Sequence, residues 1–366
     1  MQIIEIGKLL IYEQPSKYIV NSTEYDDNYA IPVLTAGKTF ILGYTDETDN
    51  VFDKLPVIIF DDFTTATKYV DFKFKVKSSA MKILHINRER VLPKYIFYRL
   101  QTINIDHSTH KRYWIQQYSK IKIAIPTIPE QEQIVKQIEE SLSKLDSAVA
   151  TLKKTKQQLE IYRLSILNQA FSDNRQMIPF GRITETRLGK MLDKEKNTGK
   201  LQRYLRNINV RWFEFDLSDL LEMRIEADEQ EKYSITTGDL VICEGGEPGR
   251  CAVWENEETI FYQKALHRVR FTDGSNPKYY MYYLWLINKS GALSKYFTGT
   301  GIKHLTGQSL TKVLVPQTEL SQQDKTVEYI ENQFYTFDRI EETINQSLRQ
   351  TEVLRQSVLK QAFEGD

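Results

Sequence analysis

The sequence predicts an α+β protein with two mixed α/β heads separated by two long helices, which pack as an antiparallel coiled coil with pseudo-two-fold symmetry. The first observation is a duplication: adding 192 to a position between residues 130 and 173 gives its counterpart near the carboxyl end, so that Asp146 matches Asp338 and Arg163 matches Arg355. The second observation is that each copy follows about 130 to 145 residues of strand-like character. The predicted order is head 1 at 1–129, helix 1 at 130–175, head 2 at 176–320 and helix 2 at 321–366.

Both copies of the repeat carry hydrophobic residues at the heptad spacing of a coiled coil. A helix of about 40 residues is about 60 Å long, and so narrow an apolar stripe does not stabilise it alone. We therefore expect the two helices to pack together; the alternative is that each lies independently on its own head. The predicted seam consists of Ile138, Leu142, Leu145, Leu152, Leu159, Ile166, Ile330, Phe334, Phe337, Ile344, Leu348 and Val358.

The heads have strand and turn patterns. The apolar run 56–60 predicts a buried strand, and the alternation of Phe and Val with Lys over 72–77 predicts a half-buried strand with a basic outer face. In the second head, 239–243 and 251–254 predict two strands joined by a tight turn at the Gly-rich segment between them. Each head also carries a short helical stretch, at 93–100 and at 277–287.

Composition excludes several classes of protein. The chain has 366 residues with 41% hydrophobic and 27% charged residues, has no 18-residue apolar run, and has two cysteines, Cys243 and Cys251. These values predict a cytoplasmic, multidomain protein with reduced thiols and no membrane segment. Nucleotide-binding glycine motifs and metal-ligand spacings are missing from the sequence. An adenine methyltransferase motif is missing too, and the nearest stretch, 276–279, is interpreted as a helix cap. These absences argue against a P-loop ATPase, a dinucleotide-binding enzyme and an adenine methyltransferase.

Charge is unevenly distributed along the neutral chain. Residues 1–67 carry four Lys/Arg and eleven Asp/Glu, whereas residues 68–122 carry thirteen Lys/Arg and three Asp/Glu. A dense basic stretch suggests a surface that faces a polyanion, and an ordinary solvated charged face is the alternative.

Polar loops close both heads, at 108–114 and at 300–305. Basic and aromatic residues on such loops suit contacts to phosphates and base edges, although any single residue can equally be an ordinary exposed one. The candidate DNA-binding residues are Lys68, Lys111, Arg112, Trp114, Arg206, Arg250, Lys303 and His304.

One constellation resembles an enzyme site. Asp61 or Asp62, followed by Asp71 and Lys73, resembles the Asp…Asp-x-Lys arrangement of metal-dependent nucleases. The pattern is short, and the second head has no counterpart at the matching place. A nuclease that uses Asp62, Asp71 and Lys73 is therefore a weak alternative.

Over essentially its full length the chain resembles the specificity subunits of type I restriction–modification systems. The segments that carry the resemblance are 56–84, 238–254, IPTIPEQEQI at 125–134, and the LNQAF and LKQAF helix endings. The resemblance implies two target recognition domains that each read one half of a split double-stranded DNA sequence. It implies docking of two modification subunits, with restriction subunits as optional further partners. These partners bring S-adenosylmethionine, ATP and magnesium and serve phage defence. The resemblance therefore implies that this chain is non-catalytic and holds no cofactor of its own.

The expected mechanism is geometric. Two heads that face the same side of B-DNA require half-sites about one turn, roughly 34–36 Å, apart. The paired helices then act as a ruler, and the bases between the half-sites go unread. The alternative on the same scaffold is a stand-alone DNA-binding or anti-restriction decoy, although a near-neutral chain is poorly suited to bind DNA tightly by itself.

Overall fold

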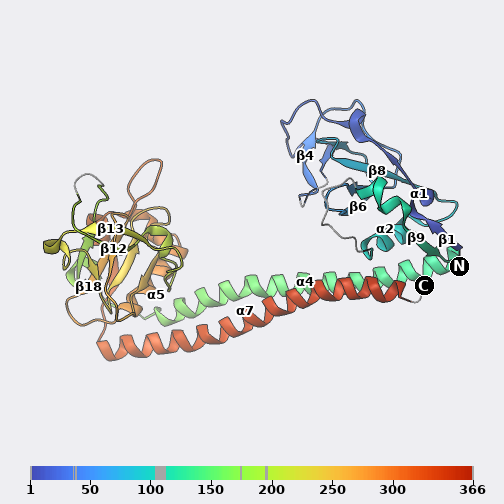
Figure 1. The fold of residues 1–366 in the computed structure, drawn as a ribbon. Coiled ribbons are helices and arrows are strands. Elements are labelled where there is room, and N and C mark those ends of the chain that lie inside the picture. Colours follow the sequence, from blue (N-terminus) through green and yellow to red (C-terminus); the bar gives the residue numbers. More distant parts are fainter. Residues whose placement is uncertain are drawn as a thin grey trace. The chain divides into compact units, whose positions relative to one another are not determined.

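The protein is represented by a computed structural model that describes residues 2–35, 37, 39–103, 113–173, 175–193 and 197–364. The chain forms two compact units: one contains Met1–Lys153 and Asn345–Asp366, and the other contains Lys154–Ile344. Two long helices, α4 (Ile128–Ala170) and α7 (Leu320–Phe363), contribute to both units (Figure 1). Each unit therefore combines one head with a part of both helices. No helix of the described segments is long and apolar enough to span a membrane.

The first head contains a four-stranded antiparallel sheet in the order β2-β8-β5-β6 and a three-stranded sheet in the order β4-β3-β7. All five residues of β5 are buried, which confirms the strand expected at 56–60. The strands are β2 (Leu10–Glu13), β3 (Ile31–Leu34), β4 (Ile41–Thr45), β5 (Val57–Asp61), β6 (Thr67–Val70), β7 (Lys75–Val76) and β8 (Met81–Ile86).

The prediction of a half-buried strand with a basic outer face over 72–77 is wrong in two respects. Only Lys75–Val76 form a strand, β7, which pairs in parallel with β3. Lys75 points inward and is 1% exposed, because its Nζ lies 2.8 Å from Oε2 of Glu47 and donates to the Asp49 carbonyl at 2.7 Å. A buried ammonium is tolerated when such partners replace water.

The second head contains two four-stranded sheets, in the orders β11-β18-β15-β16 and β13-β12-β17-β14. Strands β15 and β16 pair antiparallel across the glycine-rich turn, as predicted. The strands are β11 (Thr184–Leu188), β12 (Lys200–Leu205), β13 (Leu221–Ile225), β14 (Ser234–Ile235), β15 (Leu240–Cys243), β16 (Cys251–Val253), β17 (Ile260–Tyr262) and β18 (Leu266–Phe271).

Both heads are closed by the same kind of two-stranded ribbon. In the first head β1 (Gln2–Glu5) pairs with β9 (Lys122–Ile125), and in the second β10 (Met177–Pro179) pairs with β19 (Leu314–Pro316). A glycine follows the first strand of each ribbon. A Cβ on Gly7 would lie 3.0 Å from the Ser119 carbonyl oxygen, and one on Gly181 would lie 2.8 Å from Cβ of Thr311. The chain thus enters each long helix from an equivalent, closely packed junction.

A buried glutamine attaches each long helix to its own head. The side chain of Gln131 in α4 accepts a hydrogen bond from the Leu92 amide at 2.8 Å, just before α2 (Pro93–Gln101). Its counterpart Gln323 in α7 accepts from the Asn276 amide at 2.7 Å, just before α5 (Pro277–Lys289). The Asn276 side chain also accepts from the Lys278 amide at 2.9 Å, which confirms the helix cap.

The long helices pair antiparallel within each unit (Figure 1). In the unit of the second head, Lys156 Nζ lies 3.2 Å from Glu341 Oε1, and Arg163 Nη2 lies 2.7 Å from Asp338 Oδ1. Residue numbers increase along α4 in the direction in which they decrease along α7, so the two helices are antiparallel. All twelve residues of the predicted seam are buried or half-buried. Ile138 and Ile330 also belong to the cores of their heads, so the start of each helix packs on the head as well.

Candidate nucleic-acid interface

The turn between β15 and β16 of the second head is fixed by several distant segments. The Leu305 amide donates to the Glu244 carbonyl at 2.7 Å, and Nδ2 of Asn288 donates to the Pro248 carbonyl at 2.9 Å. Gly249 has φ of 91°, and a Cβ there would lie 2.4 Å from Cδ2 of Leu293. Glycine is therefore required at this position. The turn is a rigid centre around which the neighbouring loops are arranged.

Arg250 connects this turn to a second loop. Its Nη1 donates to Oε2 of Glu247 at 3.0 Å, and its Nη2 donates to the carbonyl oxygen and to Oδ1 of Asn207, at 2.9 and 3.0 Å. Nδ2 of Asn207 in turn donates to the Gly245 carbonyl. The other carboxylate oxygen of Glu247 accepts from Nε1 of Trp212 at 2.7 Å. Both Nη groups of Arg250 are thus occupied by acceptors of the protein itself.

Arg206 is engaged in a similar way. Its Nη2 donates to the carbonyl oxygen and to Oδ2 of Asp219, at 2.7 and 2.6 Å. A bidentate contact with phosphate or guanine uses two N–H groups of one guanidinium. Because Nη2 of both arginines is already bound and Nε of both is buried, this geometry argues against the bidentate DNA contacts that the sequence suggested for Arg206 and Arg250.

Lys303 and His304 lie on a hairpin beside the turn. The amides and carbonyls of Thr298 and His304 pair with each other at 2.8 and 2.9 Å, and Lys303 Nζ donates to the Gly299 carbonyl at 2.8 Å. The His304 ring packs against Gly245, where an added Cβ would lie 3.0 Å from Nδ1. Lys303 is exposed at the edge of this hairpin, in a place where a ligand can reach it.

The buried side chain of His267 binds the backbone at the end of this hairpin. Its Nε2 lies 2.9 Å from the Leu305 carbonyl and must donate, since a carbonyl only accepts. Burial lowers the pKa of His267, although the Leu305 contact and Glu244 oppose this effect. Nδ1 is buried with no hydrogen-bond partner among the described residues. The neutral tautomer with hydrogen on Nε2 therefore fits the site.

Sequence reasoning missed several residues of this cluster: Asn207, Trp212, Glu247 and Ile302. Glu247 lies in the turn itself, whereas Asn207 and Trp212 reach it from 38 and 35 residues away, and no local pattern signals these contacts. Ile302 is 75% exposed on the hairpin, next to the candidate Lys303. The polar residues Thr300, Gly301 and Lys303 made this loop a candidate for DNA contacts. Nothing in the sequence pattern indicated that the isoleucine among them is exposed.

The first head gives a different outcome. Lys68 in the edge strand β6 is exposed, with its Nζ 5.8 Å from the Phe40 ring centroid. Trp114 is 2% exposed and packs against Phe60 with ring centroids 5.2 Å apart. It is a core residue and is not available to a base, so the expected DNA contact of Trp114 is wrong. Lys111 and Arg112 lie outside the described residues.

Two acidic residues of the nuclease alternative, Asp61 and Asp62, have structural partners, whereas Asp71 is exposed. Oδ1 of Asp61 accepts from the Phe63 amide at 2.8 Å, and Oδ1 of Asp62 accepts from the Trp114 amide at 2.8 Å. Asp62 is also buried and lies 3.3 Å from Lys82 Nζ. Within the ranges that the structure describes, no group of three or more His, Cys, Asp or Glu could hold a metal ion.

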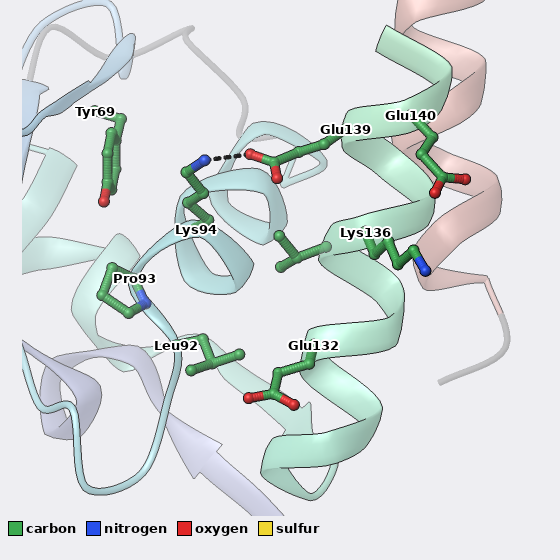
Figure 2. Close-up of a pocket in the computed structure, with 9 residues that line it drawn as sticks. Tyr69, Leu92, Pro93, Lys94, Glu132, Lys136, Glu139 and Glu140 are labelled. Atoms are coloured by element: carbon green, nitrogen blue, oxygen red, sulfur yellow. Dashed lines mark hydrogen bonds and ion pairs between the residues drawn. The ribbon is translucent and has the colours of Figure 1, made fainter. Parts of the chain in front are cut away.

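A groove of about 480 Å³ lies where the first head meets its long helix. Figure 2 shows Lys94 of α2 reaching Glu139 of α4 over a floor that includes Leu92 and Pro93. The second head repeats the ion pair, with Lys278 Nζ 2.9 Å from Oε1 of Glu331. Glu139 and Glu331 are counterparts in the duplication, so the junction is the same in two heads whose loops differ.

The protein-family model described as type I restriction modification DNA specificity domain matches this chain twice, over residues 1–161 and 188–350. The chain belongs to this family. Each match covers one head and most of the long helix that follows it. The two specificity domains therefore correspond to the two copies of the duplicated head-and-helix plan.

Curated relatives of this family member are specificity subunits from Escherichia coli. The Type I restriction enzyme EcoR124I/EcoR124II specificity subunit is 45% identical over 177 residues, which cover 45% of this chain and 44% of the relative. The EcoKI specificity subunit of strain K12 is 24% identical over 271 residues, 68% of this chain and 58% of the relative. The chain thus spans about half the length of the curated relatives that it matches.

Solved structures of specificity subunits share the fold. A chain from work on complex assembly and conformational transition of the type I R-M system matches with a TM-score of 0.73 and 14% identity, covering 99% of this chain and 97% of that chain. The HsdS subunit from Thermoanaerobacter tengcongensis matches with a TM-score of 0.54 and 14% identity, covering 100% and 97%. At this identity the likeness establishes the two-head, two-helix fold.

Proposed function

We propose that this chain is the DNA-recognition subunit of a type I restriction–modification complex and reads a bipartite, asymmetric target. The observation that carries the proposal is the double match to a DNA specificity domain, one match for each head. The loops of the heads differ while their junctions with the helices are repeated. Different loops suit different half-sites, and repeated junctions suit one common architecture.

The proposed partners are double-stranded DNA and two modification subunits, with restriction subunits as possible further members. Support for two copies of one partner comes from the exposed faces of the long helices. Ile161 and its counterpart Val353 are 65% and 69% exposed, and the neighbouring pair Tyr162 and Leu354 is also exposed. An apolar pair that is exposed at the same place in both copies suits a protein that binds twice.

In this proposal the chain contributes no chemistry of its own. S-adenosylmethionine, ATP and magnesium belong to the partner subunits, whereas this chain binds and orients the DNA. Lys68, Lys303 and His304 remain the proposed contacts with DNA, since these side chains reach the surface. Lys111 and Arg112 are retained as proposals from the sequence.

The test is to produce the chain with its modification subunits and map methyladenine on random-sequence DNA. The expected target has two unlike half-sites separated by a gap of constant length. The variant His304→Ala should lose sequence preference at the half-site of the second head only. The expected loss of discrimination between bases is about 1–3 kcal/mol for one base contact. A single continuous motif, or methylation without sequence preference, would contradict the proposal.

A further inference from the structure

The hydrogen bonds around Arg250 form a network that joins three loops of the second head. Arg250 binds Glu247 within its own turn and Asn207 on the loop after β12. Glu247 holds Trp212 on the segment that follows Asn207, and Asn207 holds the carbonyl of Gly245. The turn thereby fixes both ends of the 207–212 loop.

The same turn supports the hairpin that carries the candidate DNA contacts. Gly245 packs against the His304 ring, and the neighbouring Glu244 accepts from the Leu305 amide at 2.7 Å. A displacement of the turn therefore moves the base of the hairpin. The loop, the turn and the hairpin are therefore linked, and a shift of one displaces the others. We call residues 206–212, 244–250 and 298–304 together the recognition surface.

Arg250 is poorly placed to bind DNA itself. Its side chain is 15% exposed, and both of its Nη groups already donate to the protein. Its Nε is buried without a partner among the described residues. Three of its four Nη hydrogens already have acceptors in the protein, and Nε is buried. A bidentate contact with phosphate would therefore require Arg250 to release Glu247 or Asn207, which would break the link between the loops.

We propose that Arg250 is a positioning residue: it sets the base preference of the second head by holding the three loops of the recognition surface in register, and it contacts neither phosphate nor base. This inference rests on the proposed function, since it concerns how that function obtains its specificity. Glu247 and Asn207 act with Arg250 as its two attachment points.

The chemistry of the side chain makes the proposal testable with a substitution that keeps the charge. Lysine carries the same charge as arginine but lacks the planar fork that binds two acceptors at fixed angles. In Arg250→Lys the charge near DNA is retained while the link between Glu247 and Asn207 is lost. A positioning role and a phosphate contact therefore predict different results.

The experiment uses the full chain in complex with its modification subunits and labelled duplexes that carry the target found by methylation mapping. Each half-site is also presented with one base pair changed, and binding is measured at several salt concentrations. For Arg250→Lys we expect at least a tenfold loss of preference at the second half-site. Preference at the first half-site and the slope of log K against log salt should stay as in the wild type.

The control is Arg224→Lys, the same chemical change in β13 of the same head, where the guanidinium donates to the Gly199 carbonyl at 2.9 Å. It should keep the wild-type preference at both half-sites. Glu247→Gln provides a second variant if Arg250→Lys fails to fold, and it should lower the preference in the same direction.

Two results would overturn the proposal. An unchanged preference in Arg250→Lys and Glu247→Gln would show that the network does not set specificity. Equal weakening of all sequences by Arg250→Met, together with a salt slope lower by about 0.9, would identify Arg250 as a phosphate contact. A wild-type complex without preference for any two-part sequence would instead contradict the proposed function, and so the two failures are distinguishable.

Discussion

Arg163 of α4 donates from Nη2 to Oδ1 of Asp338 in α7 at 2.7 Å, and the duplication repeats this contact with the helices exchanged. The counterpart of Arg163 is Arg355 in α7, and the counterpart of Asp338 is Asp146 in α4. Arg355 forms an ion pair with Asp146 in the other unit. The one arginine and one aspartate that each copy contributes therefore form two ion pairs between the helices, one in each unit.

The two ion pairs should differ in strength, because Arg163 is more buried and has more partners. Its side chain is 10% exposed and also binds Glu341 at 3.0 Å, whereas that of Arg355 is 29% exposed. We expect Arg163→Met to lower the free energy of unfolding by about 1.5–3 kcal/mol, as for hydrogen bonds to charged groups. Arg355→Met should lower it by about 0.2–1 kcal/mol, as for exposed pairs.

Urea unfolding of the two variants measures this difference, and a double-mutant cycle of Arg163 with Asp338 isolates the pair energy. An equal loss in both variants would contradict the assignment of the larger role to Arg163.

The phenylalanine at the carboxyl end of each long helix, Phe363 in α7 and Phe171 just after α4, is expected to stabilise the head against which it packs. Phe363 of α7 is 4% exposed, lies 5.4 Å from the Tyr95 ring centroid, and has the Arg99 guanidinium 5.1 Å above its ring. Its counterpart Phe171, the residue that follows α4, lies 5.0 Å from the Tyr279 ring centroid in the second head. Phe363→Ala should destabilise the first head by about 3–5 kcal/mol.

Hydrogen exchange locates this loss. Protection should fall in α2 and β5 of the first head and remain unchanged in α5 of the second, with the reverse pattern for Phe171→Ala. Val353→Ala, at an exposed position of the same helix, is the control and should change stability by less than about 0.5 kcal/mol. A loss spread equally over both heads would refute the local role.

The repeat made much of this fold predictable. The 192-residue offset alone predicts the helices, their seam and the equivalence of Arg163 with Arg355. It does not show that each arginine pairs with the aspartate of the other copy, because that contact depends on the axial register of the two helices as well as on their antiparallel direction. The end of each helix was recognised from the repeated Gln-Ala-Phe, but its partners, Tyr95 and Tyr279, lie on the heads.

The site was less predictable, because the same residue types serve in the core and at the surface. Trp114 and Lys75 looked like surface residues in their local sequence, but Phe60 and Glu47 bury them from other segments of the head. Arg250 was predicted to contact DNA, whereas its Nη groups bind the protein itself. Its role depends on Asn207, 43 residues away, and no local spacing reveals that contact.

Acid should weaken the second head through His267. Burial lowers the pKa of His267 below the ordinary value of 6.5, so the unfolded chain binds a proton at this residue more readily than the folded head does. The contribution of neutral His267 is fully present above pH 6.5 and decreases as the pH falls from 6.5 toward the lowered pKa. Thermal melts between pH 5 and 8 measure this dependence.

His267→Gln is the matched variant, since its amide can still donate to the Leu305 carbonyl but does not titrate in this range. It should show a flatter dependence of stability on pH than the wild type between pH 5 and 6.5. If the two proteins have parallel curves, His267 is not the group responsible.

The duplicated apolar pair on the long helices predicts the number of modification subunits that bind. Ile161→Glu should leave the fold intact, because the side chain is already 65% exposed, and should reduce the complex from two bound subunits to one. Val353→Glu should do the same, and the double variant should bind none. Size-exclusion chromatography with light scattering gives the stoichiometry.

Ile340→Glu is the control, because Ile340 is 40% exposed on α7 but its counterpart in α4 is Ala148, so this patch is not duplicated. This variant should still bind two subunits. If Ile161→Glu and Val353→Glu also bind two, the partner docks elsewhere on the chain.

The length of the helices should determine the gap between the half-sites. Lys153 and Lys154 are consecutive residues within α4, and Ile344 and Asn345 are consecutive within α7, at the boundaries of the two units. Inserting one heptad at both places preserves the seam, because the hydrophobic repeat keeps its phase. Seven helical residues add about 10.5 Å at 1.5 Å per residue, close to three base pairs at about 3.4 Å each.

Methylation mapping of this variant should return both half-sites unchanged with a gap about three base pairs longer. Inserting four residues in place of seven is the control, because it shifts the apolar positions out of phase and should lower the stability of the helix pair. A heptad variant that methylates the original target with the original gap would show that spacing is set by the DNA or by the partner subunits, and not by these helices.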